Sequence, residues 1–197
     1  MSKVILATTS PYRKEVFAYI GIPFETEKSN VDESQVKRES PEKLVRVLSQ
    51  LKAEAVAKNH RDAIVIGMDS VGCFNHQILE KPKSREEAFQ RLRSLSLKNF
   101  QFYTGVFVID IAFKKRISRI VKTEIFMRNL SDEEIKRYLN EDPEIYNYAL
   151  GYDPLKYLSS TFVRRIEGSY NNFTRGIPLE EIIEILYELR EDLSEFI

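Results

Sequence analysis

The first half of the chain alternates short apolar runs with longer amphipathic stretches. Apolar runs at residues 3–7 and 63–66 predict buried strands, and "IPFETEK" at residues 22–28 predicts a third strand. One helix is predicted to begin at Pro11, after the loop "TTS", and a longer one at Ser40-Pro41. The apolar stripe expected on the longer helix consists of Leu44, Leu48, Leu51 and Ala55.

The second half adds antiparallel signals to this alternation. Residues 71–79 predict a hairpin that turns at Asn75-His76, and residues 106–113 and 117–127 predict two long strands joined at residues 114–116. Two helices are predicted at the capping-box pairs Ser84/Glu87 and Ser131/Glu134. A further strand is predicted at residues 161–166, and a last helix over residues 179–196, whose apolar stripe consists of Ile182, Leu186, Leu189 and Leu193. We therefore expect an α/β fold with a mixed, partly antiparallel sheet flanked by helices, as one domain over residues 1–197 with two lobes around a central cleft.

Composition narrows the class of protein. Hydrophobic residues make up 43% of the chain and charged residues 30%, and the 30 Lys and Arg residues balance the 30 Asp and Glu residues. This balance disfavours a general nucleic-acid binder, and no apolar run is long enough to span a bilayer. A lone cysteine, Cys73, and the lack of a signal-peptide pattern predict a reducing, cytoplasmic setting.

Two carboxylates follow predicted strands. The strand at residues 63–66 is expected to end at Gly67, which would place Asp69 at the carboxyl edge of the sheet, where ligands bind in open α/β folds. A carboxylate there can hold Mg²⁺ or take a proton from water. In "VDES", Asp32 and Glu33 offer a second carboxylate for the same cation. The alternatives are a turn-forming aspartate and a solvated acidic loop.

Cations stand at two helix entries, where the helix dipole disfavours them. Ser10 is a good N-cap, yet Arg13 and Lys14 fall in the first turn that follows it. Lys81 and Lys83 come directly before the helix that Ser84 caps. An anion such as a phosphate, bound by backbone N–H groups and these side chains, explains both placements; solvated basic turns are the alternative, and for Lys83 the favoured one.

These motifs together resemble one family. "ILATTSPYRKEVF", "VDES", "LKAEAVA", "VIGMDSV", "ILEKPKSREEAFQRLRSL", "YTGV" and "FVRRIEGSYNN…GIPL" occur in the order found in the Maf (septum-formation-protein) nucleotide pyrophosphatases. The resemblance covers nearly the whole chain. It implies a fold similar to that of inosine-triphosphate pyrophosphatases, and hydrolysis of a nucleoside triphosphate to the monophosphate and pyrophosphate with Mg²⁺ or Mn²⁺.

The resemblance also implies roles for individual residues. Ser10 and Arg13 would hold phosphate oxygens together with the neighbouring Lys14, and Glu33 and Asp69 would organise the metal. Asp69 would activate the attacking water. Lys52 would reach the triphosphate from the long helix, and Lys81 would neutralise the leaving pyrophosphate.

Three positions depart from the family pattern and bear on base specificity. Tyr12 stands where the dTTP/UTP-hydrolysing branch has a second arginine, and an aromatic residue there is more similar to the 7-methyl-GTP branch, where it would stack on a base. Ser70 replaces the threonine or glutamine of those branches, and Lys156 lies near the usual glutamine. We therefore expect a shifted or relaxed base preference.

The predicted function is removal of modified or surplus nucleotides by a nucleoside triphosphate pyrophosphatase. The alternative is a nucleotide-binding regulator of cell division or septum formation with little or no turnover. The expected partner is a nucleoside triphosphate, and neither nucleic acid nor a membrane is expected. The sequence leaves open whether the protein forms a homodimer.

Overall fold

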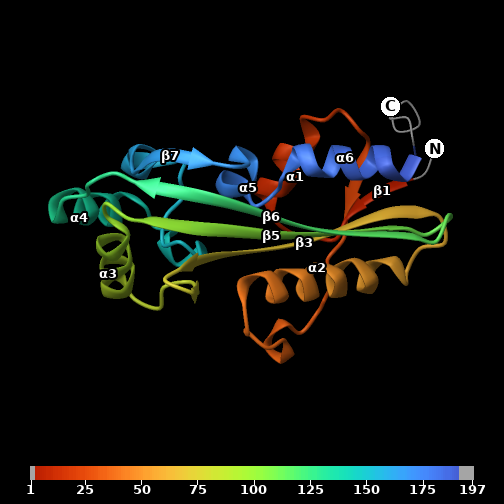
Figure 1. Cartoon of the computed structure of the whole chain (residues 1–197), viewed down its shortest axis with the longest axis horizontal. Coiled ribbons are helices and arrows are strands. Elements are labelled where there is room, and N and C mark those ends of the chain that lie inside the picture. The colour runs from red at the N-terminus through yellow and green to blue at the C-terminus, as the bar shows by residue number, and fades with distance from the viewer. Residues whose placement is uncertain (1–2, 191–197) are drawn as a thin grey trace.

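One seven-stranded mixed sheet runs through the whole computed structural model, which describes residues 3–190 (Figure 1). Its strand order is β2-β1-β3-β5-β6-β7, and β4 pairs separately with β3. The pairs β1–β2 and β1–β3 are parallel and all the others are antiparallel, so the sheet is mixed, as the sequence predicted. The strands are β1 (Lys3–Leu6), β2 (Phe24–Thr26), β3 (Ala63–Phe74), β4 (Gln77–Leu79), β5 (Asn99–Asp110), β6 (Lys115–Met127) and β7 (Val163–Glu167).

Helices cover both faces of this sheet. They are α1 (Pro11–Ala18), α2 (Pro41–Ala57), α3 (Arg85–Leu95), α4 (Asp132–Glu141), α5 (Tyr170–Arg175) and α6 (Leu179–Arg190), with 3-10 turns at Glu33–Gln35, Ile145–Asn147 and Tyr157–Thr161. Figure 1 shows α2 on one face and α1 and α6 on the other. The alternation of β3 explains both layers, because Ile64 and Ile66 pack in the core with α1 and α6, whereas Val65 packs in the core with α2. No described helix has the length and apolar character needed to cross a membrane.

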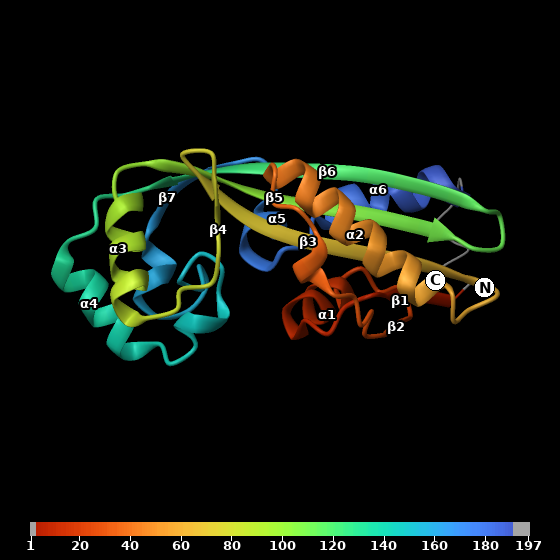
Figure 2. The same ribbon diagram turned by 90° about the horizontal axis from the view of Figure 1, so that it is seen from below.

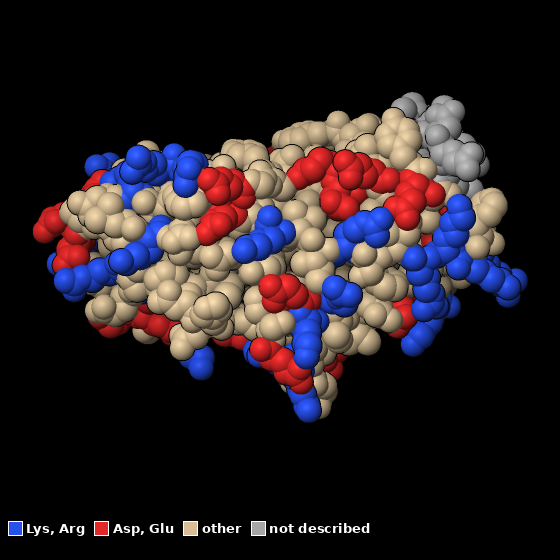
Figure 3. Space-filling view, viewed as in Figure 1, with Lys and Arg blue, Asp and Glu red and all other residues tan. Residues whose placement is uncertain are grey.

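Two lobes share the sheet, and Figure 2 shows them side by side. One holds α1, α2 and α6, and the other buries its own core under α3 and α4, with Phe100, Leu92 and Tyr138 fully buried. The two-lobed mixed α/β fold predicted from the sequence is therefore confirmed. On the face shown in Figure 3, basic and acidic side chains are interspersed and acidic ones gather where α6 lies.

The end predicted for the central strand was wrong. β3 does not stop at Gly67 but continues to Phe74, because its pairing with β5 continues without interruption, with Asp69 opposite Gly105. Asp69 therefore lies within a strand and not in a turn after one. On the other edge of β3, pairing with β1 ends at Ile66 and pairing with β4 begins at Gly72. Between these points the described structure leaves one edge of β3 without a neighbouring strand, and Asp69 lies there.

Several element boundaries also differ from the prediction. The strand predicted at residues 106–113 begins earlier, at Asn99, and ends at Asp110, because the apolar residues after it form the turn to β6, where Phe113 is exposed. The stripe of α2 was wrong at Leu51, which is 36% exposed. Ser84 caps α3, but the Glu87 side chain accepts a hydrogen bond from Lys83 N–H and not from Ser84. Ser131 and Glu134 form the full capping box, and Leu193 lies outside the described residues.

Candidate active site

A lysine lies between two carboxylates at the open edge of β3. The Nζ atom of Lys52, on α2, donates to Asp69 Oδ1 at 2.6 Å and lies 2.8 Å from Glu33 Oε1. Glu33 begins a 3-10 turn that Asp32 caps by accepting a hydrogen bond from Ser34 N–H. The Asp32 carboxylate therefore stabilises this turn, while the Glu33 carboxylate faces Lys52. The structure thus brings together Asp69, Glu33 and Lys52 from three separate segments.

Burial controls the protonation of Asp69. The residue is 8% exposed, and loss of hydration raises the pKa of its carboxyl above the ordinary value. The positive charges of Lys52 and, to a smaller extent, Arg13 oppose this rise because they stabilise the ionised form. A carboxyl with a raised pKa is a stronger proton acceptor once ionised, which suits a general base.

Replacing Lys52 with methionine is expected to make protein stability fall more steeply as pH rises. Because the folded-state pKa of Asp69 is raised, its contribution to stability is fully present below the unfolded pKa of about 3.9 and is lost as pH rises through the folded pKa. Without Lys52 that pKa rises further, so the loss becomes larger and extends to higher pH.

Urea unfolding of metal-free wild-type and Lys52→Met protein over a pH series measures this effect. The two curves of unfolding free energy should separate progressively as pH rises. Lys43→Met, an exposed lysine of the same helix paired with Glu39, should run parallel to the wild type. Parallel curves for Lys52→Met would mean that Lys52 does not set the ionisation of Asp69.

Arg13 connects three segments at the same edge. Its guanidinium donates to the carbonyl oxygens of Gly176 at 2.8 Å and Met68 at 3.0 Å, and to Ser70 Oγ at 2.8 Å. Met68 lies in the part of β3 that is paired with β5 on one edge and has no described strand on the other, so Arg13 satisfies a backbone acceptor of that part. Burial lowers the pKa of Arg13, and the charges of Asp69 and Glu33 oppose this effect.

Ser70 and Gly176, which both accept hydrogen bonds from Arg13, also contact each other. Ser70 Oγ also lies 2.7 Å from Thr104 Oγ1, within hydrogen-bonding distance. Gly176 ends α5 with a φ of 65°, a left-handed conformation that suits glycine, and a Cβ there would lie 2.9 Å from Ser70 Oγ. The predicted site residues Arg13 and Ser70 are therefore in direct contact.

Two pockets meet at Arg13. The smaller, of about 160 Å³, is polar and includes the Thr8-Thr9 loop, Glu33 and Lys52. The larger, of about 340 Å³, falls in the size range of small-ligand sites. It is lined by Ser10, Tyr12, Arg13, Ser70, Lys81, Phe102, Asn147, Tyr148, Ala149, Leu150, Tyr152, Asp153, Pro154, Phe173, Thr174, Arg175 and Gly176.

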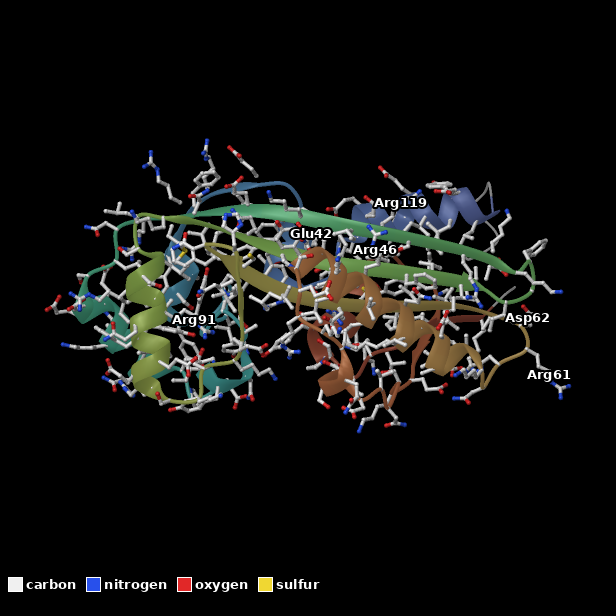
Figure 4. All side chains as sticks on the ribbon, turned by 60° about the horizontal axis from the view of Figure 1, so that its bottom comes forward. Glu42, Arg46, Arg61, Asp62, Arg91 and Arg119 are labelled. Carbon is white, nitrogen blue, oxygen red and sulfur yellow. The ribbon has the colours of Figure 1, made fainter. Side chains whose placement is uncertain are left out.

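Lys81 lies at the larger pocket, on a loop that is fixed by hydrogen bonds and an ion pair to the preceding residue, Glu80. Arg91 of α3 donates to the carbonyl oxygens of Glu80 and Ala149, and Arg38 pairs with the Glu80 carboxylate. Figure 4 shows Arg91 on the side of α3 that faces β4. Lys81 itself is exposed and lines the larger pocket.

Other predicted residues are placed differently. Ser10 caps α1 as expected, accepting the Arg13 N–H at 3.4 Å, and it also lines the larger pocket. Lys14 is exposed and lines neither pocket, and the same holds for Lys83. Lys156 reaches the site by donating to the Tyr12 hydroxyl at 3.2 Å.

Sequence reasoning did not identify Asp153 and Arg175, which line the larger pocket. Asp153 is buried and Arg175 Nη1 donates to both of its carboxylate oxygens, at 3.0 and 3.2 Å. The available signal was an acidic residue in an otherwise apolar "GYDP" stretch and an arginine directly before Gly176.

Comparison with known proteins assigns the family. The family model described as "Maf-like protein" matches residues 3–189. The chain belongs to the Maf family. Two curated relatives carry different names. A dTTP/UTP pyrophosphatase of Pelotomaculum thermopropionicum is 35% identical, and the match covers 94% of this chain and 96% of the relative's chain. A 7-methyl-GTP pyrophosphatase of Nitrosococcus oceani is 33% identical over 93% of this chain and 91% of its own.

The comparison of structures finds a HAM1 protein from Coxiella burnetii. It covers 95% of this chain and 100% of its own, with a TM-score of 0.48 and 12% sequence identity.

The Maf site offers a limited set of metal ligands. Among residues 3–190, no group of three or more His, Cys, Asp and Glu side chains is placed to hold a metal ion. Asp69 Oδ1 and Glu33 Oε1 both contact the Lys52 ammonium, which fills the point between them. A divalent cation would therefore have to be bound by the other oxygens of the two carboxylates. Because Mg²⁺ is commonly bound by one or two carboxylates together with waters and substrate phosphates, these donors fit a cation shared with a triphosphate.

Proposed function

We propose that this Maf protein hydrolyses a nucleoside triphosphate to the monophosphate and pyrophosphate. The observation that carries the proposal is the pair of pockets joined at Arg13, one aromatic and of ligand size, the other small, polar and beside Lys52 and Glu33. Full-length relatives named as pyrophosphatases of two different nucleotides support it.

In this proposal the larger pocket takes the nucleoside and the smaller pocket takes the phosphates. Aromatic side chains such as Phe102, Tyr148 and Phe173 suit a base and sugar. The Thr8-Thr9 loop and Arg13 suit phosphate oxygens, because they line the smaller pocket and because hydroxyl groups and a guanidinium donate hydrogen bonds. A triphosphate crossing from one pocket to the other would pass Arg13 and Asp69.

The reaction then follows from these placements. Asp69 accepts a proton from water, and the water oxygen attacks the α-phosphorus as its bond to the bridging oxygen of pyrophosphate breaks. Arg13, which lines both pockets, would stabilise the charge of the departing pyrophosphate, and Lys81 would do so from the edge of the larger pocket; Lys52 favours the ionised form of Asp69 against the effect of its burial. Positioning and charge suffice, so a protein nucleophile is not needed.

Maf pyrophosphatases are generally metal-dependent. In this chain Asp69 and Glu33 would hold a divalent cation, Mg²⁺ or Mn²⁺, together with phosphate oxygens. When bound, the cation would neutralise charge on the polyphosphate. Such an enzyme would remove modified or surplus nucleotides from the cellular pool.

The test separates the two products. Purified protein is incubated with a panel of nucleoside triphosphates and Mg²⁺ or Mn²⁺, and pyrophosphate and orthophosphate are scored separately. We expect equimolar monophosphate and pyrophosphate, abolished by a chelator and restored by excess metal. Release of orthophosphate alone would contradict the proposal, and tight binding without release would favour a nucleotide-binding regulator.

A further inference from the structure

The short segment Lys81-Pro82 is anchored at both ends by one pair of side chains on α3. Arg91 donates to the carbonyl oxygen of Glu80, the residue before the segment. Glu87 Oε2 accepts the N–H of Lys83, the residue after the segment, at 2.8 Å. Arg91 and Glu87 lie one turn apart on the helix, and Arg91 Nη2 donates to Glu87 Oε1 at 3.0 Å. Glu87 therefore binds Arg91 with one oxygen and the loop with the other.

The segment between these two anchor points has little freedom of its own. Proline fixes the backbone angle φ of Pro82 at about −65° and restricts Lys81, the residue before it, to extended conformations. The Arg91 side chain is only 10% exposed, and its burial lowers the pKa of the guanidinium, whereas the charge of Glu87 opposes this effect. The backbone of Lys81 is therefore held at the edge of the larger pocket.

Two further contacts connect this loop to the pocket wall and to the other lobe. Arg91 also donates to the carbonyl oxygen of Ala149, which lines the larger pocket. Arg38, from the loop before α2, pairs with the Glu80 carboxylate. The side chains of that ion pair are 45% and 53% exposed, so the pair contributes little and Arg91 is the main anchor.

The Lys81 side chain itself is not held in this way. Among residues 3–190, no carboxylate lies within ion-pair distance of its ammonium. The fold thus fixes the backbone of Lys81 and leaves its charge available for a ligand in the larger pocket.

We propose that Arg91 and Glu87 are positioning residues that act through Lys81. This inference rests on the proposed function, in which Lys81 stabilises the departing pyrophosphate, and it adds the residues that place Lys81. On an unanchored loop, ordering this lysine would cost conformational entropy at the moment of reaction. The anchor provides that order before the nucleotide binds. Because Arg91 also contacts Ala149, one guanidinium fixes the loop relative to the wall of the nucleoside pocket.

The test asks whether Arg91 matters only while Lys81 is present. Arg91→Met keeps a long side chain but cannot donate to either carbonyl oxygen. We expect it to lower kcat/KM about tenfold, the value of one hydrogen bond to a charged group. In a Lys81→Met background the same substitution should lower kcat/KM by less than about twofold, because the positioned group is absent. Equal losses in both backgrounds would overturn the proposal, since Arg91 would then support the fold and not Lys81.

A second variant and a control belong to this comparison. Glu87→Ala removes the contact to Lys83 N–H at a side chain that is 40% exposed, so it tests the anchor if Arg91→Met does not fold. Its effect should also disappear in the Lys81→Met background. Arg93→Met is the matched control, because Arg93 lies on the same helix, is 58% exposed and pairs with Asp132. It should leave kcat/KM unchanged in both backgrounds.

Amide hydrogen exchange of residues 80–83 gives a readout that needs neither nucleotide nor turnover. Exchange at Lys83 N–H should be about tenfold faster in Arg91→Met and in Glu87→Ala than in the wild type, and unchanged in Arg93→Met. If no nucleotide yields pyrophosphate but exchange rises in the two anchor variants, hydrolysis fails and the positioning of Lys81 stands. If pyrophosphate is released and exchange at residues 80–83 is the same in all proteins, positioning is overturned and hydrolysis stands.

Discussion

Substituting Asp69 with asparagine is expected to lower kcat for pyrophosphate release by about 10²- to 10⁴-fold, the usual contribution of a general base. Asparagine keeps the shape of the side chain but cannot accept a proton from water. The dissociation constant for the nucleotide without divalent metal should change little, because Arg13, Lys52 and Lys81 keep their charges. Steady-state kinetics and calorimetry on the same preparation measure the two quantities.

The stability of this variant distinguishes a chemical defect from a folding defect. Burial raises the pKa of Asp69, which means that the ionised carboxylate costs folding free energy at neutral pH. The neutral amide would remove that cost but would leave Lys52 with Glu33 as its carboxylate partner, so the thermal midpoint of Asp69→Asn should stay close to that of the wild type. Asp62→Asn, a change at the far end of the sheet in Figure 4, is the control and should keep full activity. Activity of Asp69→Asn within threefold of the wild type would exclude Asp69 as the base.

The central strand shows where sequence patterns were sufficient and where they failed. The run 63–66 was correctly predicted as buried, since α2, α1 and α6 cover both of its faces. After Ile66 the strand still packs on both sides, with Gly67 against α2 and Met68 in the core with α1 and α6. Its pairing with β1 has ended, however, and the polar residues Asp69 and Ser70 follow, of which Ser70 lines the larger pocket. That change was interpreted as the end of the strand, whereas the long-range partner β5 keeps it extended.

Lys52 carried a signal that the stripe prediction missed. Leu44 and Leu48 are buried and Lys52 is the next position at the same spacing, so it continues the stripe where the prediction placed Leu51. A lysine on the buried face of a helix requires a partner charge, and Asp69 is that partner. Which carboxylate it pairs with depends on how α2 crosses β3, and no local pattern contains that information.

The nucleoside pocket was the least predictable part. Asp153 and Arg175 come from an irregular stretch and a six-residue helix, α5, which has no apolar period to reveal it. These two residues are 22 positions apart in the sequence, and only the folded chain brings them into contact. Tyr12 and Lys156 were singled out through the family resemblance, but their contact with each other also exists only in the folded chain.

Substituting Gly67 with alanine is expected to lower the free energy of unfolding by about 3 kcal/mol and kcat by about 100-fold. A Cβ at Gly67 would lie 2.2 Å from Ser49 O and 2.6 Å from Ala53 N, both backbone atoms of α2. Backbone atoms cannot turn away as a side chain does, so the whole helix must move. Gly105, opposite Asp69 on β5, makes an equally close approach to Val45 O.

The catalytic effect follows because the displaced part of α2 carries Lys52. Moving the helix away from β3 lengthens the 2.6 Å contact between Lys52 Nζ and Asp69 and leaves the buried carboxyl with less opposing charge, so its pKa rises further. The acid limb of the pH–rate profile should therefore shift to higher pH, which a general loss of stability would not cause. Gly21→Ala, at φ 78° with no atom within 4 Å of the added Cβ, should cost stability through backbone strain and keep the pH profile unchanged. Wild-type stability and an unshifted profile in Gly67→Ala would show that the close approach of α2 does not set the Lys52–Asp69 contact.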